Sequence, residues 1–416
     1  MIAPRSAVYL GFICVLASCG GGGGGGDAGP DATLDAGDGG SQDGALFDAG
    51  DGGEPDAGPA GVPLTGVVAI ATGHAHACAL LGDGSVWCWG DNRSGQLGDD
   101  TVDGRAFAAP AMIEGVVSID AGGFSTYAVM MDGKRAAWGF DADGQLADNR
   151  TDVRVRPSIR GGTTHQRVAG GARHSCWQME SGAVFCSGDN AFGQLGNDST
   201  RDSRILVRTR RLALDVTRLA LGDSHSCALS DSGVARCWGS NARGELGVGD
   251  FFNRLTPTVT DTEARFVEIT AGDVHTCGLD EAGALYCWGN NYRKRLGLDE
   301  RTWKSSPTSI DTAPVMSQIS AGGAFTCGLD MSSRVVCWGE DRFEQLGVSL
   351  DPPERAEILP VPGVGRATQV SSGADFACAL LADTTVQCWG RDHRGQLGDG
   401  LIQDVGPPAQ VLVPVE

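Results

Sequence analysis

The sequence predicts an all-β fold, a seven-bladed β-propeller in which each blade arises from one repeat. A segment resembling Gly73–Gly98 recurs seven times, at intervals of 49 to 51 residues. Each copy contains short strand-like runs between turns, and the 64 Gly residues leave few stretches that favour a helix. Repeats of this length bury a core only by stacking on their neighbours, which predicts closure into a ring. The other copies begin at Gly122, Gly171, Gly222, Gly272, Gly322 and Gly373.

The first segment, residues 1–18, has the pattern of a secretion signal. Arg5 precedes an apolar run at residues 7–16, which is too short to span a membrane as a helix. Leu16-Ala17-Ser18-Cys19 resembles the lipobox of bacterial lipoproteins. The resemblance implies that Cys19 is lipidated and becomes the first residue of the mature protein. Gly20 after the Cys implies sorting to the outer membrane, on a side that the sequence does not define. The alternative is an ordinary signal peptide cleaved near Ser18.

Residues 19–63 form the second segment, a Gly/Asp/Ala-rich stretch that predicts a disordered tether. A flexible coil of about 40 residues would reach roughly 35 Å. The tether contains nine Asp and Glu residues and no Lys or Arg, so much of the formal net charge of −20 lies outside the predicted propeller. The acidic balance argues against a nucleic acid partner. The propeller itself is predicted at residues 64–416.

One repeat illustrates the expected strands. Residues 110–113, 116–120, 125–131 and 134–138 are four strand candidates, and the last two form a hairpin. In the first copy the hairpin turns at residues 82–84. A three-residue turn needs a left-handed backbone at its last position, which favours Gly. Gly occupies this position in five copies, whereas Ser333 and Thr384 replace it in the last two.

Twelve of the 14 Cys residues form six pairs with the same spacing. The hairpin register places the two Cys of a pair opposite each other at a non-hydrogen-bonded position, which suits a disulfide. The spacing matches no zinc site. We therefore expect six disulfides and an oxidising compartment. The second copy has Tyr127 and Ala137 at these places. The pairs are Cys78 with Cys88, Cys176 with Cys186, Cys227 with Cys237, Cys277 with Cys287, Cys327 with Cys337, and Cys378 with Cys388.

The two ends of the repeat region predict how the ring closes. The first copy begins at Val67 without a leading strand, and residues 408–415 resemble that strand. We expect the C-terminal strand to pair with the first blade and complete it, which would remove an exposed sheet edge.

The His-x-Cys-Ala-Leu, Val-x-Cys-Trp-Gly and Gly-Gln-Leu-Gly segments resemble the regulator of chromosome condensation repeat family, over residues 64–416. The Cys pairs resemble those of its secreted bacterial members, which include a β-lactamase inhibitor. The resemblance implies a propeller with a flat, rigid binding surface. The family's eukaryotic namesake implies another activity, guanine-nucleotide exchange on a small GTPase.

Two kinds of repeated residue are candidates for chemistry, and for both we expect a structural role. His76, His174, His225 and His275 occupy one repeat position, where Phe325 and Phe376 stand in other copies. Because Phe replaces His, we expect packing and hydrogen bonding between blades rather than a metal site. The repeated Trp residues are expected in the interblade core rather than on a sugar-binding platform. Ser187 replaces Trp in the third copy. We predict no metal, cofactor or catalytic residue.

The repeat is broken by basic residues in the loops after the second, third and fifth copies. These loops occupy equivalent places in the ring, so we predict a basic arc that suits an anionic partner. The alternative is scattered, solvated charge. The candidate binding residues are Arg204, Arg208, Arg210, Arg293, Lys294, Arg295 and Trp303.

These features predict a monomeric, non-enzymatic protein, anchored by lipid, that binds an unidentified envelope or extracellular protein or glycan. The membrane is contacted only through the anchor. Guanine-nucleotide exchange is disfavoured because an exported protein would not meet a cytosolic GTPase. A third hypothesis is a polysaccharide lyase or hydrolase, which clustered carboxylates on one face would support.

Overall fold

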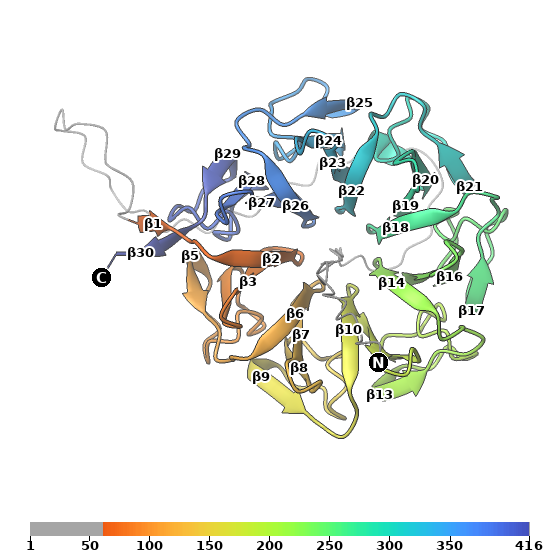
Figure 1. The fold of residues 1–416 in the computed structure, drawn as a ribbon, viewed down its shortest axis with the longest axis horizontal. Coiled ribbons are helices and arrows are strands. Elements are labelled where there is room, and N and C mark those ends of the chain that lie inside the picture. The colour runs from red at the N-terminus through yellow and green to blue at the C-terminus, as the bar shows by residue number, and fades with distance from the viewer. Residues whose placement is uncertain (1–60, 416) are drawn as a thin grey trace, which may run out of the picture.

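The computed structural model describes residues 61–415 and shows seven four-stranded antiparallel sheets arranged as the blades of a ring (Figure 1). The seven-bladed all-β prediction is confirmed. Blade 1 contains β2 (Val67–Thr72), β3 (His76–Leu81), β4 (Val86–Gly90) and β5 (Arg105–Pro110); blade 2, β6 (Val116–Ala121), β7 (Ser125–Met130), β8 (Arg135–Gly139) and β9 (Arg154–Arg160); blade 3, β10 (His165–Gly170), β11 (His174–Met179), β12 (Val184–Gly188) and β13 (Ser203–Arg208).

The remaining blades repeat this order. Blade 4 contains β14 (Val216–Leu221), β15 (His225–Ser230), β16 (Ala235–Gly239) and β17 (Arg254–Val259); blade 5, β18 (Phe266–Ala271), β19 (His275–Asp280), β20 (Leu285–Gly289) and β21 (Lys304–Ser309); blade 6, β22 (Met316–Ala321), β23 (Phe325–Asp330), β24 (Val335–Glu340) and β25 (Glu354–Pro360); blade 7, β26 (Ala367–Ser372), β27 (Phe376–Leu381), β28 (Val386–Arg391) and β29 (Val405–Gln410). A single-turn 3₁₀ helix, η1 (Tyr292–Lys294), lies in blade 5. Residues 61–415 contain no helix with the length and apolar character needed to cross a membrane.

The central hairpin of each blade turns as the sequence predicts. In blade 1 the amide of Leu81 donates to the carbonyl of Ser85, and the amide of Gly84 donates to the carbonyl of Leu81. The last turn residue has a left-handed backbone, with φ of 84° at Gly84, 62° at Ser333 and 69° at Thr384. The two non-Gly residues therefore carry the strain that a Cβ atom brings to this conformation, about 1 kcal/mol or more each.

The order of strands within a blade differs from the prediction. Residues 110–113 were expected to form a leading strand, but β5 ends at Pro110 and pairs with β4 as the outermost strand of blade 1. After the Gly-Gln-Leu-Gly turn the chain returns along the outside of the same sheet. Each outer strand therefore follows the three inner ones. The buried side chains of Ala111 and Ile113 enter the core between blades 1 and 2.

Ring closure is consequently only partly as expected. The C-terminal strand does pair near blade 1, but β30 (Leu412–Pro414) joins β1 (Gly61–Pro63) in a separate two-stranded sheet that contacts β5. It does not complete a blade, because blade 1 already has four strands from residues 67–110. A backbone hydrogen bond of 3.3 Å from Ala374 of blade 7 to His74 of blade 1 also joins the first and last blades.

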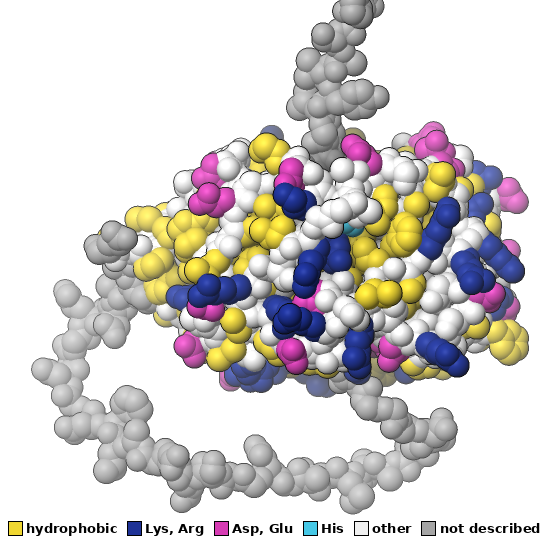
Figure 2. Space-filling model, turned by 90° about the horizontal axis from the view of Figure 1, so that it is seen from below, with side chains coloured by type: hydrophobic (Ala, Val, Ile, Leu, Met, Phe, Trp, Pro, Cys, Tyr) yellow, Lys and Arg dark blue, Asp and Glu magenta, His cyan; other side chains and the backbone are white. Residues whose placement is uncertain are grey.

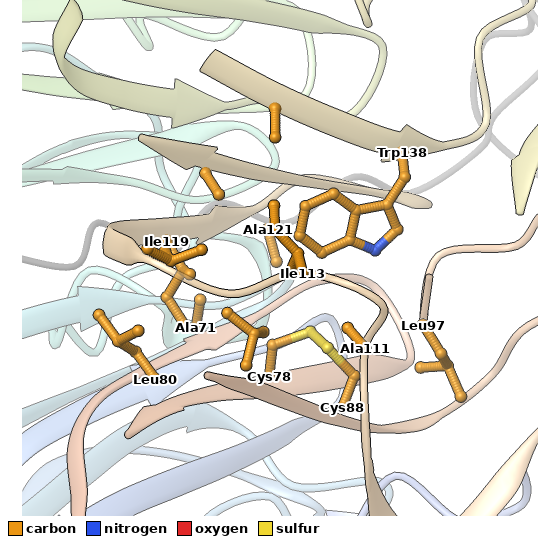
Figure 3. Packing of buried hydrophobic residues seen from close by; sticks show 14 of the residues in the cluster. Ala71, Cys78, Leu80, Cys88, Leu97, Ala111, Ile113, Ile119, Ala121 and Trp138 are labelled. Atoms are coloured by element: carbon orange, nitrogen blue, oxygen red, sulfur yellow. A yellow bond between two sulfur atoms is a disulfide. The ribbon is translucent and has the colours of Figure 1, made fainter. Parts of the chain in front are cut away.

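The core consists of seven wedges of buried side chains, one between each pair of neighbouring blades of the described chain. In the wedge between blades 1 and 2, the Cys78–Cys88 disulfide lies among Ala111, Ile113 and Trp138 (Figure 3). All six predicted disulfides are present, each with its Cα atoms 4.1 Å apart. A bridge across so short a loop contributes about 2.7 kcal/mol in the chain-entropy model. The predicted signal, Cys19 and most of the tether lie outside the described residues.

Candidate functional site

The repeated His residues join neighbouring blades. The Nε2 atom of His76 in blade 1 lies 3.0 Å from the hydroxyl of Thr126 in blade 2. That hydroxyl donates to the carbonyl of Gln96, at 2.8 Å, and the indole of Trp138 donates to the same carbonyl at 2.9 Å. Since the hydroxyl proton is committed to Gln96, the His ring must donate from Nε2. We call this His–hydroxyl–carbonyl–Trp network an interblade clasp.

Three further wedges contain the same pair of groups. His174, His225 and His275 lie 2.8 to 2.9 Å from hydroxyls of the following blade, those of Ser226, Thr276 and Thr326. Burial lowers the pKa of His76 to about 4, of His174 to about 3 and of His225 to about 4, so these rings are neutral at physiological pH. The expected role in packing and hydrogen bonding between blades is confirmed.

The wedges between blades 6 and 7 and between blades 7 and 1 replace the polar pair by an apolar pair. Phe325 faces a blade that carries Ala377, and Phe376 faces a blade that carries Ala77, in the positions of His and Thr. The Phe and His rings occupy the same place. A Cβ atom added at Gly73 would overlap His76, and one added at Gly373 would overlap Phe376. Both kinds of wedge contain examples of the bond from the Trp indole to the neighbouring carbonyl, such as that from Trp389 to Gln345 at 3.0 Å, whereas the buried indole nitrogen of Trp288, between blades 4 and 5, has no partner.

The repeated Trp residues are part of this core and are not available to a ligand. All six side chains are fully buried, and so is Trp177, which has no counterpart in other copies. The prediction of an interblade role over a sugar platform is confirmed. The repeated residues are Trp89, Trp138, Trp238, Trp288, Trp338 and Trp389.

The predicted basic arc is not one surface. The side chain of Arg295 is only 7% exposed, and its guanidinium donates to the carbonyls of Tyr292 and Gly323. Its own carbonyl accepts from Thr326 and Trp338 in a clasp. Arg295 was therefore wrongly predicted as a surface residue. It occupies the repeat position of the Gln whose carbonyl serves the clasp, and this holds the residue inside the ring.

The other candidate binding residues of blade 5 differ in exposure, and the two basic ones form ion pairs with acidic side chains. Arg293 lies 3.3 Å from Glu340 and 3.7 Å from Glu354, and Lys294 lies 3.2 Å from Asp299. Trp303 is half exposed. All of blade 4 lies between these residues and the candidates of blade 3 (Figure 1). The two groups are thus separate parts of the rim.

The basic residues that do come together lie on the outer strands of blades 2 and 3. β9 has the sequence RVRPSIR and β13 has SRILVR, and neither contains an acidic residue. The other outer strands carry at most one basic residue each, and β25 adds two Glu. Figure 2 looks onto the rim from below the ring of Figure 1, the side of β9 and β13, where Lys and Arg side chains gather. We define the basic edge as Arg154, Arg156, Arg160, Arg204 and Arg208.

The members of the basic edge differ in their pairing. Arg154 lies 3.0 Å from Asp148, Arg160 lies 3.6 Å from it, and Arg156 pairs with Asp100. Next to the edge, Arg210 lies 3.8 Å from Asp198. Within residues 61–415, the recorded ion pairs include neither Arg204 nor Arg208, and both side chains are exposed. Among the five residues of the basic edge, Arg204 and Arg208 are therefore the two whose guanidiniums are available to an external anion.

A hollow of about 480 Å³ adjoins the basic edge. Arg208 lines it together with apolar side chains that include Met179, Phe185 and Leu214. A partner with an anionic group and an apolar neighbour would meet complementary chemistry here. The sequence offered no signal for this hollow, because its lining comes from a hairpin, an outer strand and two connections between blades.

A second feature lies in the turns at the centre of the ring. Asp223 and Asp273 stand at one position of adjacent blades, and the amide of Asp223 donates to the carbonyl of Asp273 at 3.3 Å. Burial, followed by the charges of neighbouring carboxylates, raises the pKa of Asp223 to about 6 and that of Asp273 to about 8. No group of three or more His, Cys, Asp or Glu side chains in residues 61–415 is arranged to hold a metal ion.

Comparison with known proteins places these features in context. The sequence model of the RCC1-like domain family matches residues 35–347. The sequence model of the regulator of chromosome condensation (RCC1) repeat matches residues 367–396. The ultraviolet-B receptor UVR8 of Arabidopsis thaliana is 30% identical over 196 residues, 45% of this chain and 44% of the receptor. The human probable E3 ubiquitin-protein ligase HERC4 is 29% identical over 193 residues, 46% of this chain and 14% of the ligase. The chain thus spans less than half the length of these relatives.

Solved structures agree on the fold. Human WBSCR16 superposes with a TM-score of 0.70 at 23% identity, over 80% of this chain and 94% of that one. Prp20p of Saccharomyces cerevisiae superposes with a TM-score of 0.67 at 21% identity, over 75% of this chain and 81% of that one. At such identities the likeness concerns the fold alone.

Proposed function

This chain belongs to the RCC1-like domain family, and we propose that it is an exported, non-enzymatic binding propeller whose basic edge engages an anionic partner. One observation carries the proposal. The residues that the repeats share are buried and occupied in clasps, disulfides and turns, so they are unavailable to a partner. The main break in the repeat on the outer strands is a concentration of Arg on β9 and β13, in a protein with a formal net charge of −20. Such a local reversal of charge favours anionic partners.

Export is supported by the disulfides. Six bonds buried in the wedges suit an oxidising compartment, and the lipobox-like sequence at Cys19 suggests the route. We propose that a lipid on Cys19 anchors the protein at the outer membrane, and that residues 19–63 let a monomeric propeller reach an envelope or extracellular protein or glycan. The same disulfides weigh against guanine-nucleotide exchange in the cytosol. Because proteins with the same fold can have different functions, the similarity to the receptor UVR8 or to the ligase HERC4 does not identify the partner of this protein.

The location is tested by fractionating the producing cells. The wild-type protein should sediment with the outer membrane, and Cys19→Ala should appear in a soluble fraction. Equal membrane association of both proteins would exclude a lipid anchor at this residue.

The binding role is tested with purified envelopes from the same cells and a Cys19→Ala background. We expect the double reversal Arg204→Glu/Arg208→Glu to lower envelope binding at least tenfold, a loss of about 1.4 kcal/mol. Binding of the wild-type chain should also weaken as salt rises. Arg366→Glu is the control, because Arg366 is exposed on blade 7 across the ring. If reversal and control bind alike, the basic edge is not the site.

A second candidate function, action on a polysaccharide, is favoured by the adjacent Asp223 and Asp273. Their unequal, raised pKa values would suit one acid and one base near neutral pH. The test is release of new chain ends from a panel of acidic and neutral polysaccharides. Activity that Asp223→Asn/Asp273→Asn abolishes would establish an enzyme, and an inactive wild-type protein would remove this candidate.

A further inference from the structure

The exposed aromatic side chains are confined to one sector of the ring. Within residues 61–415, all five lie in loops of blades 3, 4 and 5. These loops lead from the third strand of a blade to its outer strand. The five residues are Phe192, Phe251, Phe252, Tyr292 and Trp303. Exposed aromatic groups cost hydration free energy, so a cluster of them indicates an interaction surface.

Four of these side chains lie on the adjacent blades 4 and 5. The rings of Phe251 and Trp303 lie 6.2 Å apart across the two blades, and Phe252, the next residue in the chain after Phe251, is 73% exposed. Two residues before Trp303, the guanidinium of Arg301 lies 5.9 Å from the ring of Tyr292. We call Phe251, Phe252, Tyr292 and Trp303 the aromatic surface.

The backbone under the aromatic surface is fixed before any partner arrives. The buried side chain of Asn241 donates to the carbonyls of Asp250 and Phe252, at 2.8 and 3.2 Å. Arg254 donates to the carbonyl of Phe252 at 2.7 Å, and the amide of Gly249 donates to the carbonyl of Ser305 in blade 5. A fixed loop loses little entropy on binding, which favours affinity.

The fold of the loop does not require aromatic residues. In blade 3, Asn190 donates in the same way to the carbonyls of Ser199 and Arg201. The residues corresponding to Phe251 and Phe252 are there Thr200 and Arg201. The same loop therefore forms with polar residues at its tip, and the aromatic ones need another explanation.

The charges around the aromatic surface favour a protein over a sugar. Lys304 lies 2.9 Å from Glu300, Arg254 lies 2.6 Å from Asp250, and Arg301 pairs with Glu354. A sugar-binding site needs free polar groups for hydroxyls, whereas these carboxylates are already paired. Trp, Tyr and Arg are the residues that dominate protein–protein binding energies. The pairing also leaves this sector without the excess positive charge of the basic edge.

We propose that the aromatic surface is a second binding site, separate from the basic edge, for an apolar segment of another polypeptide. Phe252 and Trp303 are its anchors. Because the local charges are paired internally, binding there depends little on salt. The proposal does not depend on the anionic partner, since reversing Arg204 and Arg208 leaves these loops unchanged.

The test is selection of a random dodecapeptide phage library against the full-length protein. We expect enriched peptides with aromatic or aliphatic residues. Their Kd should rise at least tenfold for Phe252→Ala/Trp303→Ala and stay unchanged for Arg204→Glu/Arg208→Glu and between low and high salt. Met331→Ala is the matched control, since it removes an exposed apolar side chain from the turn of blade 6. Circular dichroism and thermal unfolding verify that each variant is folded.

Several results would overturn the proposal. These are a selection that enriches no peptide, peptides that bind the double variant as tightly as the wild type, and binding that salt removes. A glycan array on which the wild-type protein binds and the double variant does not would replace the polypeptide by a sugar. A wild-type dimer that the double variant cannot form would make a second copy of the chain the partner.

Discussion

The wedge between blades 2 and 3 and the wedge between blades 1 and 2 solve the same packing problem with different residues. The wedge between blades 1 and 2 has the disulfide Cys78–Cys88, the His76–Thr126 pair and Trp138. Its neighbour lacks all three features. Ser125 replaces His, Tyr127 and Ala137 replace the Cys pair, and Ser187 replaces Trp. The loss of these repeated features leaves the smallest of the seven core clusters.

The wedge between blades 2 and 3 is filled instead by Trp177, from a position where other blades have Ala or Gly. Its ring meets Tyr127 edge-on at 6.0 Å, and its indole donates to the hydroxyl of Ser175 at 3.1 Å. That hydroxyl donates to the carbonyl of Gln145, which takes the place of the clasp carbonyl. The ring therefore needs side chains that fill each wedge and a hydrogen-bond donor for the carbonyl between the blades. More than one set of residues can supply both.

The largest expected effect is removal of the replacement Trp. Trp177→Ala should lower the free energy of unfolding by about 3 to 5 kcal/mol, because it leaves a cavity in a wedge that has no disulfide. Urea unfolding followed by circular dichroism measures the loss. Trp87→Ala is the control, since Trp87 is only partly buried and should cost less. Equal losses for the two variants would show that Trp177 does not compensate for the missing features.

The second prediction makes blade 4 resemble blade 2 in its lack of a disulfide. Cys227→Ala/Cys237→Ala should cost about 2.7 kcal/mol from loss of the cross-link. The reverse change, Tyr127→Cys/Ala137→Cys, places Cys at paired positions of β7 and β8. We expect that disulfide to form but to stabilise by less, because Tyr127 no longer packs on Trp177. Thiol titration without reductant checks bond formation, and a full gain in unfolding free energy would contradict this account.

The third prediction exchanges a polar clasp for an apolar one. Thr126→Ala alone should cost about 1 to 3 kcal/mol, since the Nε2 donor of buried His76 loses its partner. Adding His76→Phe reproduces the Phe376–Ala77 pair and should recover most of the loss. A double-mutant cycle measured by urea unfolding gives the coupling. Additive losses would show that His and hydroxyl do not act as a pair.

The smallest expected effects come from pH. The folded-state pKa of His76 is about 4, below its usual 6.5, so the unfolded chain binds the proton first and stability falls as pH falls from 6.5 towards 4. Burial raises the pKa of Asp120, in blade 2, well above 3.8. The stability of the folded state that depends on the protonated carboxyl is therefore lost as pH rises. Relative to wild type, His76→Phe/Thr126→Ala should therefore gain stability in acid and Asp120→Asn should gain it near neutrality.

Unfolding curves at about pH 4.5 and about pH 7.5 measure both differences. Each displaced proton is worth about 1.4 kcal/mol per pH unit within its window. Parallel shifts for the two variants would show that the buried His and Asp do not titrate with opposite signs.

The sequence by itself determined the features that repeat. A 49 to 51 residue interval with Gly, Cys and Trp at fixed places gave the seven blades, the hairpin register and the six disulfides, because these depend on contacts within one hairpin. Two further signals were in the sequence and were missed. His accompanies Thr or Ser in the next copy while Phe accompanies Ala, and the Phe251-Phe252 pair stands where the other copies have no aromatic residue.

Only the tertiary structure decided the contacts that join one repeat to another. In the structure the outer strand comes last in each blade, and β1 pairs with β30. Arg295 is buried, and the basic residues of blade 3 lie apart from those of blade 5. The tertiary structure also brings Phe251 of blade 4 onto Trp303 of blade 5. The physical reason is that the repeat pattern reflects hydrogen bonding within the central hairpin. These other neighbours, about 20 to more than 300 residues apart in the chain, meet only when the outer strand folds back, the wedges pack and the ring closes.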